Sequence, residues 1–390
     1  MRKYMKRVIP FVIAILTIFI FSGCGLDPAY FLSQIFALDY IEVTIDTSSF
    51  KDRFYYQQLD EEEQTLYCEI YQGLLEQKDE IVVHSTTGEK ANEILGVVIL
   101  DSPELFWTEG SATSTAYSDT YTIVEPEYNC TREEKESKKQ QIEAAADAIL
   151  AQVPQNANEY EKLKFIYEYL IDTIEYVKGA PDNQNIYSAL VGKKSVCAGY
   201  AKAYQYLIEK LGIECIYVIG TAEGNGSSQE HAWNIVKCND KFYYTDVTWG
   251  DPLFVTEEEQ NKKMESMTYD YLCCDAGTLA KTHKIKEGYI YPECNSNDLN
   301  YYRLNKMFYE TADRRTLLNA MYATINSRGE HTIFKFANEA LYTKAGTLIK
   351  NELLEIAGEH LARRYGLEAF TCYYQEDAKL CKFIIEWTYK

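Results

Sequence analysis

Apolar side chains recur with helical spacing, or alternate as in a strand, along most of the chain. Leu66 and Leu74 fall on one side of a helix predicted over 60–75, and acidic residues at its start suit the positive end of the helix dipole. The elements predicted to follow it are a strand at 81–84, a helix at 92–99 and strands over 105–124. Together they predict a small N-terminal α/β unit over residues 59–130.

After residue 130 the pattern divides into a middle domain and a second small unit. Helices predicted at 131–151 and 158–174 lead into a middle domain that ends near residue 290. The elements predicted beyond it are a helix at 316–325, a strand at 332–336, helical segments over 338–364 and a hairpin over 370–389. This C-terminal α/β unit, 291–390, repeats the order of the first one, so a duplicated flanking domain is a hypothesis.

The first residues have the pattern of an export signal. Basic residues precede an apolar run over 8–21, and Ser22 and Gly23 stand directly before Cys24. We expect a signal peptide over 1–23, lipidation of Cys24, and a tether and linker over 24–58. The competing interpretation is an uncleaved anchor helix over 8–26, just long enough to span a bilayer. In both cases the rest of the protein is expected at the cell membrane, on its extracytoplasmic face.

Charge and cysteine content limit the function classes. The net charge is −20, and basic residues do not cluster after residue 7, so nucleic acid is not an expected partner. The 11 cysteines include no CxxC pair and no zinc-type Cys/His spacing, so no metal site is predicted. Cys372 and Cys381 flank a predicted turn; a disulfide across that hairpin and buried free thiols both remain open.

Cys197 stands at the start of a predicted helix. Ser195 is the expected N-cap and Gly212 the expected C-terminal stop, with Tyr200 and Tyr204 on the buried side. Free backbone N–H groups and the helix dipole stabilise a thiolate at such a place, and the same groups can bind an oxyanion. Position alone does not separate a nucleophile from a small buried residue.

A predicted hairpin aligns a histidine with an aspartate. After a strand at 213–220 and a polar loop at 223–230, strands at 231–237 and 241–249 meet at an Asn-Asp turn. A two-residue turn, or equally a four-residue one, sets His231 one diagonal step from Asp246 on the same face. With Cys197 they form a nucleophile, a general base and the carboxylate that orients the base.

Three blocks carry a resemblance to a known family. They are Ser195–Ala201 (SVCAGYA), His231–Val236 (HAWNIV) and Tyr244–Pro252 (YTDVTWGDP). Their order and spacing resemble the bacterial transglutaminase-like superfamily, which is related to papain-like peptidases. The resemblance implies an α+β core, in which the helix bearing Cys197 packs on an antiparallel sheet bearing His231 and Asp246, and it gives these residues the triad roles. It implies a second oxyanion donor upstream, for which Tyr187 and Gln184 are candidates, and it extends to His283.

The expected function is that of a cysteine enzyme that cleaves or transfers amide bonds through a thioester. Hydrolysis is favoured because an exported site faces water, but transfer to an amine stays open. No nucleotide or calcium motif is present, and the implied chemistry requires no cofactor. Expected partners are protein or peptide substrates, including cell-wall peptides. The alternative is a surface binding or scaffold protein that keeps the fold without turnover.

Overall fold

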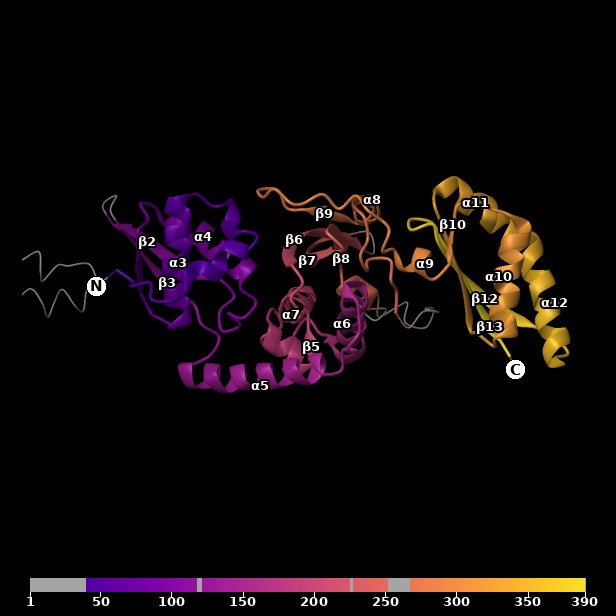
Figure 1. The fold of residues 1–390 in the computed structure, drawn as a ribbon, viewed down its shortest axis with the longest axis horizontal. Helices are drawn as coiled ribbons and strands as arrows, with labels where there is room; N and C mark the ends of the chain where they lie inside the picture. Colours follow the sequence, from indigo (N-terminus) through magenta and orange to yellow (C-terminus); the bar gives the residue numbers. More distant parts are fainter. Residues whose placement is uncertain (1–39, 118–120, 225–226, 252–266, 390) are drawn as a thin grey trace, which may run out of the picture.

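The computed structural model describes residues 40–117, 121–224, 227–251 and 267–389. Its helices and sheets form an α+β protein, as predicted. Figure 1 shows two outer bodies on either side of a middle one, with the N-terminal body at one end of the long axis and the C-terminal body at the other. The predicted signal peptide and Cys24 lie outside the described residues. Within the described ranges, no helix combines the length and the apolar character needed to cross a membrane.

The N-terminal body is a three-stranded antiparallel sheet covered by two helices. Its elements in chain order are α3 (Glu61–Leu75), β1 (Ile81–Val83), α4 (Gly88–Asp101), β2 (Ala112–Tyr117) and β3 (Tyr121–Pro126). The strand order is β1-β3-β2. Asp60 begins α3 with a capping box to Glu63, which confirms the predicted start of that helix.

Part of the segment predicted as a tether and linker packs against the folded bodies. Short 3₁₀ helices span Thr47–Asp52 and Tyr56–Gln58. Phe50 and Tyr55 are buried, and the Tyr55 hydroxyl donates to the carbonyl oxygen of Tyr217 in the middle body at 2.6 Å. Aromatic side chains in an otherwise irregular segment therefore join it to the core.

The middle body carries a four-stranded antiparallel sheet. Its helices are α5 (Arg132–Leu150), α6 (Glu159–Thr173), α7 (Cys197–Lys210) and α8 (Ala276–Leu279), with a π-helical turn at Ser188–Gly192 and a 3₁₀ turn at Thr248–Gly250. Its strands are β4 (Glu175–Tyr176), β5 (Lys194–Ser195), β6 (Cys215–Gly224), β7 (Ser227–Cys238), β8 (Lys241–Thr245) and β9 (His283–Ile285). The sheet order is β8-β7-β6-β9, with a separate β4-β5 pair. One apolar core runs through this body and the N-terminal one, and α5 passes beneath both (Figure 1).

The register of the β7–β8 hairpin is the one predicted. Cys238 pairs with Lys241 and Asn234 with Thr245, so Asp246 follows directly after the last paired residue. The predicted polar loop over 223–230 is wrong, because β6 and β7 stay paired as far as Gly224 and Ser227. Polar residues there lie on a hairpin that projects into solvent, where strand pairing does not need apolar residues.

The C-terminal body has its own core. Its elements are α9 (Tyr301–Leu304), β10 (Phe308–Tyr309), α10 (Arg314–Asn326), β11 (His331–Phe336), α11 (Glu339–Leu348), a π-helical turn at Ile349–Leu353, α12 (Leu354–Tyr365), β12 (Thr371–Asp377) and β13 (Lys382–Thr388). The strand order is β10-β11-β13-β12. β11, β13 and β12 thus match β1, β3 and β2 in chain position, order and antiparallel sense, which supports the duplication hypothesis.

A disulfide across the C-terminal hairpin does not form. Cys372 pairs with Trp387, and Cys381 lies in the turn before β13 with a positive φ of 52°. The two cysteines are therefore not opposite each other. All the cysteines in the described ranges are free.

A buried ionic cluster joins the middle body to the C-terminal one. Asp270 accepts hydrogen bonds from Lys335 of β11 and from Lys382 of β13, the latter at 2.6 Å, and all three side chains are buried. The two ammonium groups hold the pKa of Asp270 well below its usual range, although burial alone would raise it. The cluster therefore fixes the segment around Asp270 against the C-terminal sheet.

Candidate active site

Cys197 is the first residue of α7, but the cap differs from the predicted one. The N-cap residue is Val196, which has no capping side chain. The Ser195 hydroxyl donates to the carbonyl oxygen of Asn183 at 2.8 Å and lies 2.8 Å from the Ser188 hydroxyl. Ser195 therefore fastens the preceding loop instead of capping α7. Cys197 is partly exposed.

Gly199 allows the close packing of this loop against α7. A Cβ at this position would lie 1.9 Å from Ser195 Oγ and 3.1 Å from the carbonyl oxygens of Asn183 and Asn185. Real Cβ atoms do not approach so closely, so a larger residue would push the start of the helix away. The glycine in the SVCAGYA block thus has a steric role.

Further contacts fix α7 against the sheet. The Asn234 side chain, on β7, donates to the carbonyl oxygen of Ala201 at 3.0 Å, and the Tyr200 hydroxyl donates to the carbonyl oxygen of Ile174 at 2.7 Å. Tyr200, Tyr204 and Leu207 are buried, as the apolar stripe predicted. The helix start is therefore rigidly placed relative to the strand that carries His231.

His231 and Asp246 meet in a buried hydrogen bond. His231 lies on β7 opposite Gly220, and Asp246 follows β8; His231 Nε2 is 2.6 Å from Asp246 Oδ2. Their side chains are 4% and 1% exposed, so water does not screen the interaction. Burial disfavours the imidazolium, but Asp246 and Cys197 together raise the pKa of His231 to about 10. Likewise, burial opposes the charge on Asp246, yet its pKa is lowered by the facing imidazoles.

The Cys197 thiol also interacts with His231. Cys197 is a side-chain hydrogen-bond partner of His231. Because His231 Nε2 faces Asp246, we infer that Nδ1 faces the sulfur. The predicted cysteine, histidine and aspartate thus come together in the order thiol, imidazole, carboxylate.

Tyr176 is a neighbour of Cys197 that the sequence did not indicate. It interacts with both the side chain and the backbone N–H of Cys197. The Tyr176 hydroxyl therefore lies beside the start of α7. Burial, more than any other cause, raises the pKa of the Tyr176 phenol. The candidate Tyr187 lies elsewhere: its hydroxyl donates to Gln141 at 3.3 Å. Gln184 is exposed in a turn before the π-helical segment.

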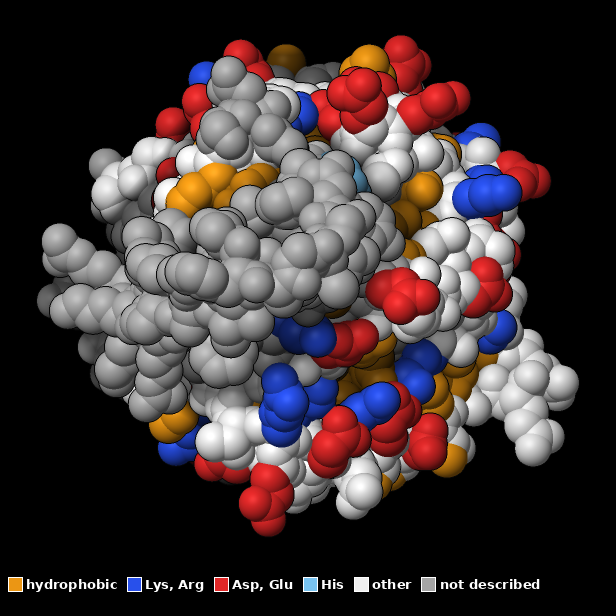
Figure 2. Space-filling model, turned by 90° about the vertical axis from the view of Figure 1, so that its left-hand side faces the viewer, with side chains coloured by type: hydrophobic (Ala, Val, Ile, Leu, Met, Phe, Trp, Pro, Cys, Tyr) orange, Lys and Arg blue, Asp and Glu red, His pale blue; other side chains and the backbone are white. Residues whose placement is uncertain are grey.

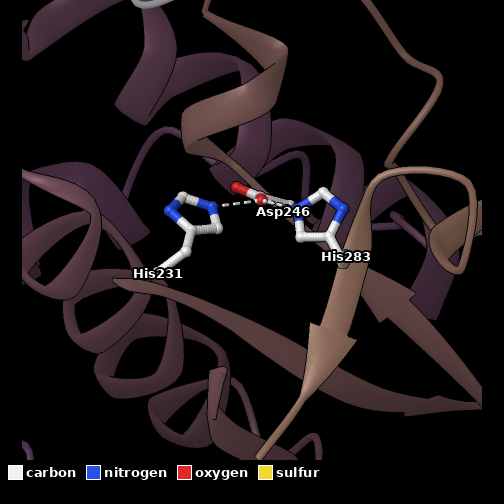
Figure 3. Close-up of side chains that lie close together, drawn as sticks. All are labelled: His231, Asp246 and His283. Atoms are coloured by element: carbon white, nitrogen blue, oxygen red, sulfur yellow. Dashed lines mark hydrogen bonds and ion pairs between the residues drawn. The ribbon is translucent and has the colours of Figure 1, made fainter. Parts of the chain in front are cut away.

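A second histidine completes the group. His283, on β9, places Nε2 2.9 Å from Asp246 Oδ2, so two imidazoles share one carboxylate oxygen (Figure 3). Asp246 Oδ1 accepts from the backbone N–H of Trp249 at 3.1 Å, and the Asp246 N–H donates to the Tyr271 carbonyl oxygen at 2.9 Å. The sequence linked His283 to the site only through the family resemblance. Its signal was a lone histidine in a short strand after the third block.

The same three residues have the donor types of a metal site. One ligand atom from each of His231, Asp246 and His283 lies within 4.8 Å of the others. Ligands of a tetrahedral zinc ion at about 2.0–2.1 Å stand roughly 3.3 Å apart. The nitrogen–oxygen separations of 2.6 and 2.9 Å are shorter and match hydrogen bonds. Hydrogen bonds therefore account for the close approach of His231, Asp246 and His283.

Comparison with known proteins identifies one domain of this chain. The model of the transglutaminase-like superfamily matches residues 143–247, which include Cys197, His231 and Asp246. Residues 143–247 of this chain therefore form a transglutaminase-like domain. Its transglutaminase-like domain is 24% identical over 129 residues to kyphoscoliosis peptidase from Mus musculus and 26% identical over 124 residues to that from Homo sapiens. These matches cover 30% and 28% of this chain but only 20% and 19% of those proteins. The match thus spans about a fifth of the length of its curated relatives.

Solved structures give weaker matches. A crystal structure of a TGase has a TM-score of 0.27 and 16% identity, covering 49% of this chain and 54% of that one. A candidate cysteine protease from Cytophaga hutchinsonii has a TM-score of 0.27 and 13% identity, covering 49% of this chain and 80% of that one.

Proposed function

We propose that this protein is a cysteine enzyme that acts on amide bonds of proteins or peptides, with Cys197 as nucleophile, His231 as general base and acid, and Asp246 as the group that orients His231. The observation that carries the proposal is the line of contacts from a partly exposed thiol through a buried imidazole to a buried carboxylate. A pure binding protein does not need these groups in this order.

The chemistry follows from the contacts. His231 takes the thiol proton, and the sulfur attacks the acyl carbon of the substrate. The tetrahedral intermediate collapses as the carbon–nitrogen bond breaks, and the imidazolium gives its proton to the leaving amine. A thioester on Cys197 remains. Water or an amine then attacks it, His231 takes the attacking group's proton, and the sulfur leaves as the thiolate with a carboxylic acid or a new amide released.

Transfer and hydrolysis share the thioester and differ in the second nucleophile. We favour hydrolysis because the proposed location is the extracytoplasmic face of the cell membrane, through the lipid on Cys24. Water is abundant there, and surface proteins and cell-wall peptides are within reach of a tethered enzyme. On the coloured part of the face shown in Figure 2, acidic and basic side chains both occur, and the basic ones lie among acidic neighbours near the lower edge. A mixed surface of this kind suits peptide partners better than a polyanion.

The experiment compares the wild type with Cys197→Ala on a peptide library that includes an amine donor, with products identified by mass. A gain of one water per cleaved peptide indicates hydrolysis, and addition of the donor with loss of ammonia or amine indicates transfer. Both should vanish in Cys197→Ala. If the folded wild type forms neither product while retaining peptides, the binding or scaffold alternative replaces the enzyme.

A further inference from the structure

A chain of buried hydrogen bonds extends behind the Asp246 carboxylate. His283 Nε2 lies 2.9 Å from Asp246 Oδ2, His283 Nδ1 lies 2.8 Å from Thr282 Oγ1, and Thr282 Oγ1 lies 2.7 Å from Tyr271 Oη. All four residues are buried, and the His283 side chain has no exposed surface. The hydrogen bonds on the side of Asp246 away from the thiol are therefore made within the protein.

The direction of this chain can be worked out from the donors available. The ionised Asp246 carboxylate only accepts, so His283 Nε2 carries a proton. In the tautomer that carries its proton on Nε2, Nδ1 accepts from the Thr282 hydroxyl, whose oxygen accepts from Tyr271. Burial raises the pKa of Tyr271 well above its ordinary value, so this phenol keeps the proton it donates. Each hydrogen bond then has one donor and one acceptor: Tyr271 donates to Thr282, Thr282 to His283, and His283 to Asp246.

Two donors converge on one carboxylate oxygen, and this restricts Asp246. Oδ1 is held by the Trp249 N–H, while Oδ2 accepts from His231 on one side and from His283 on the other (Figure 3). Without His283 the carboxylate would be held at Oδ2 only by the residue that it must orient. A carboxylate free to turn would no longer fix the ring plane and tautomer of His231.

We propose that His283 is a positioning residue, which holds the Asp246 carboxylate so that His231 faces Cys197 in the reactive orientation. This rests on the proposed function of Cys197 and His231. His283 acts only through Asp246, so its effect depends on a donor at the place of Nε2. Positioning partners of this kind affect rates by about ten- to a hundredfold in comparable sites.

The test compares glutamine, asparagine and leucine at position 283 in the full chain. Glutamine places its amide nitrogen near the position of His Nε2 and can donate to Asp246, whereas the shorter asparagine reaches only the position of Nδ1. The readout is the second-order rate constant for alkylation of Cys197 by iodoacetamide, followed by peptide mass spectrometry. Leu279→Ala, at a buried position of α8, serves as a control for general loss of stability.

We expect His283→Leu and His283→Asn to slow alkylation of Cys197 by about ten- to a hundredfold, and His283→Gln to stay within about threefold of wild type. Leu279→Ala should lower the melting temperature without a comparable loss of rate. Leucine or asparagine variants that react like wild type would overturn the role of His283. A folded glutamine variant as slow as the leucine one would also overturn it. A wild type in which Cys197 reacts no faster than the other cysteines would instead refute the proposed function.

Discussion

Replacing Asp270 with asparagine tests the buried link between the middle and C-terminal bodies. The change keeps size and shape but removes the Asp270 negative charge that faces the ammonium groups of Lys335 and Lys382, in a place where both side chains are less than a tenth exposed. At the 2.6 Å separation of Lys382 and Asp270, opposite unit charges attract by about 6 kcal/mol for an effective dielectric of about 20.

Desolvation offsets part of this attraction, and breaking a buried pair costs about 3–5 kcal/mol. We therefore expect Asp270→Asn to lower the free energy of unfolding by about 4 kcal/mol, roughly a thousandfold in the unfolding equilibrium constant. The loss should be measured by urea denaturation at pH 7. Adding Lys335→Met and Lys382→Met to the variant removes the two buried ammonium charges and should restore most of the stability.

The chain contains a matched surface control. Lys241 and Asp298 form a similar pair, but their side chains are 52% and 64% exposed. Asp298→Asn should leave the free energy of unfolding nearly unchanged, because water screens an exposed pair. If Asp270→Asn costs no more than Asp298→Asn, burial does not strengthen the ionic cluster, and the reasoning is refuted.

Three further predictions concern the site and the cysteines. Gly199→Ala should lower the melting temperature and slow alkylation of Cys197 more than tenfold, because its Cβ would overlap Ser195 Oγ. Gly96→Ala is the control: its added Cβ has no neighbouring atom within 4 Å, so it should be neutral or stabilising. The pKa of His231 is raised to about 10 in the folded protein, so the protonated imidazole stabilises the fold. This stabilisation is complete below about pH 6.5, the ordinary pKa of histidine, and is lost as the pH rises toward 10. The stability difference between wild type and His231→Gln, measured by denaturation, should therefore shrink over that range; a constant difference would contradict the ion pair. Because the described cysteines are free, adding a reductant should leave the melting temperature unchanged, and a drop would reveal a disulfide.

The sequence predicted the parts of the site that depend on local periodicity. Alternation along two strands and a short turn were enough to align His231 with Asp246, since a register with one buried face allows little slippage. The apolar stripe of α7 and the acidic start of α3 are equally local. These features could be read because each depends on residues only a few positions apart.

Features that depend on distant contacts could not be predicted. Tyr176 and His283 approach the site from segments 21 residues before Cys197 and 37 residues after Asp246, and no spacing rule links them to it. Ser195 was expected to cap α7, but its hydroxyl donates to the carbonyl oxygen of Asn183 instead. The contact of Tyr55 with the middle body could not be predicted, because its hydrogen-bond partner, Tyr217, is 162 positions away.

The most direct test of the account is the rate at which each cysteine is alkylated in the native wild type and in His231→Ala. Cys130 and Cys372 are also partly exposed, but burial raises the pKa of both thiols. Cys197 should therefore react at least tenfold faster than either, and His231→Ala should remove that advantage while the other rates stay the same. Equal rates at the three cysteines in the wild type, or a Cys197 rate that His231→Ala leaves unchanged, would contradict the proposed catalytic group.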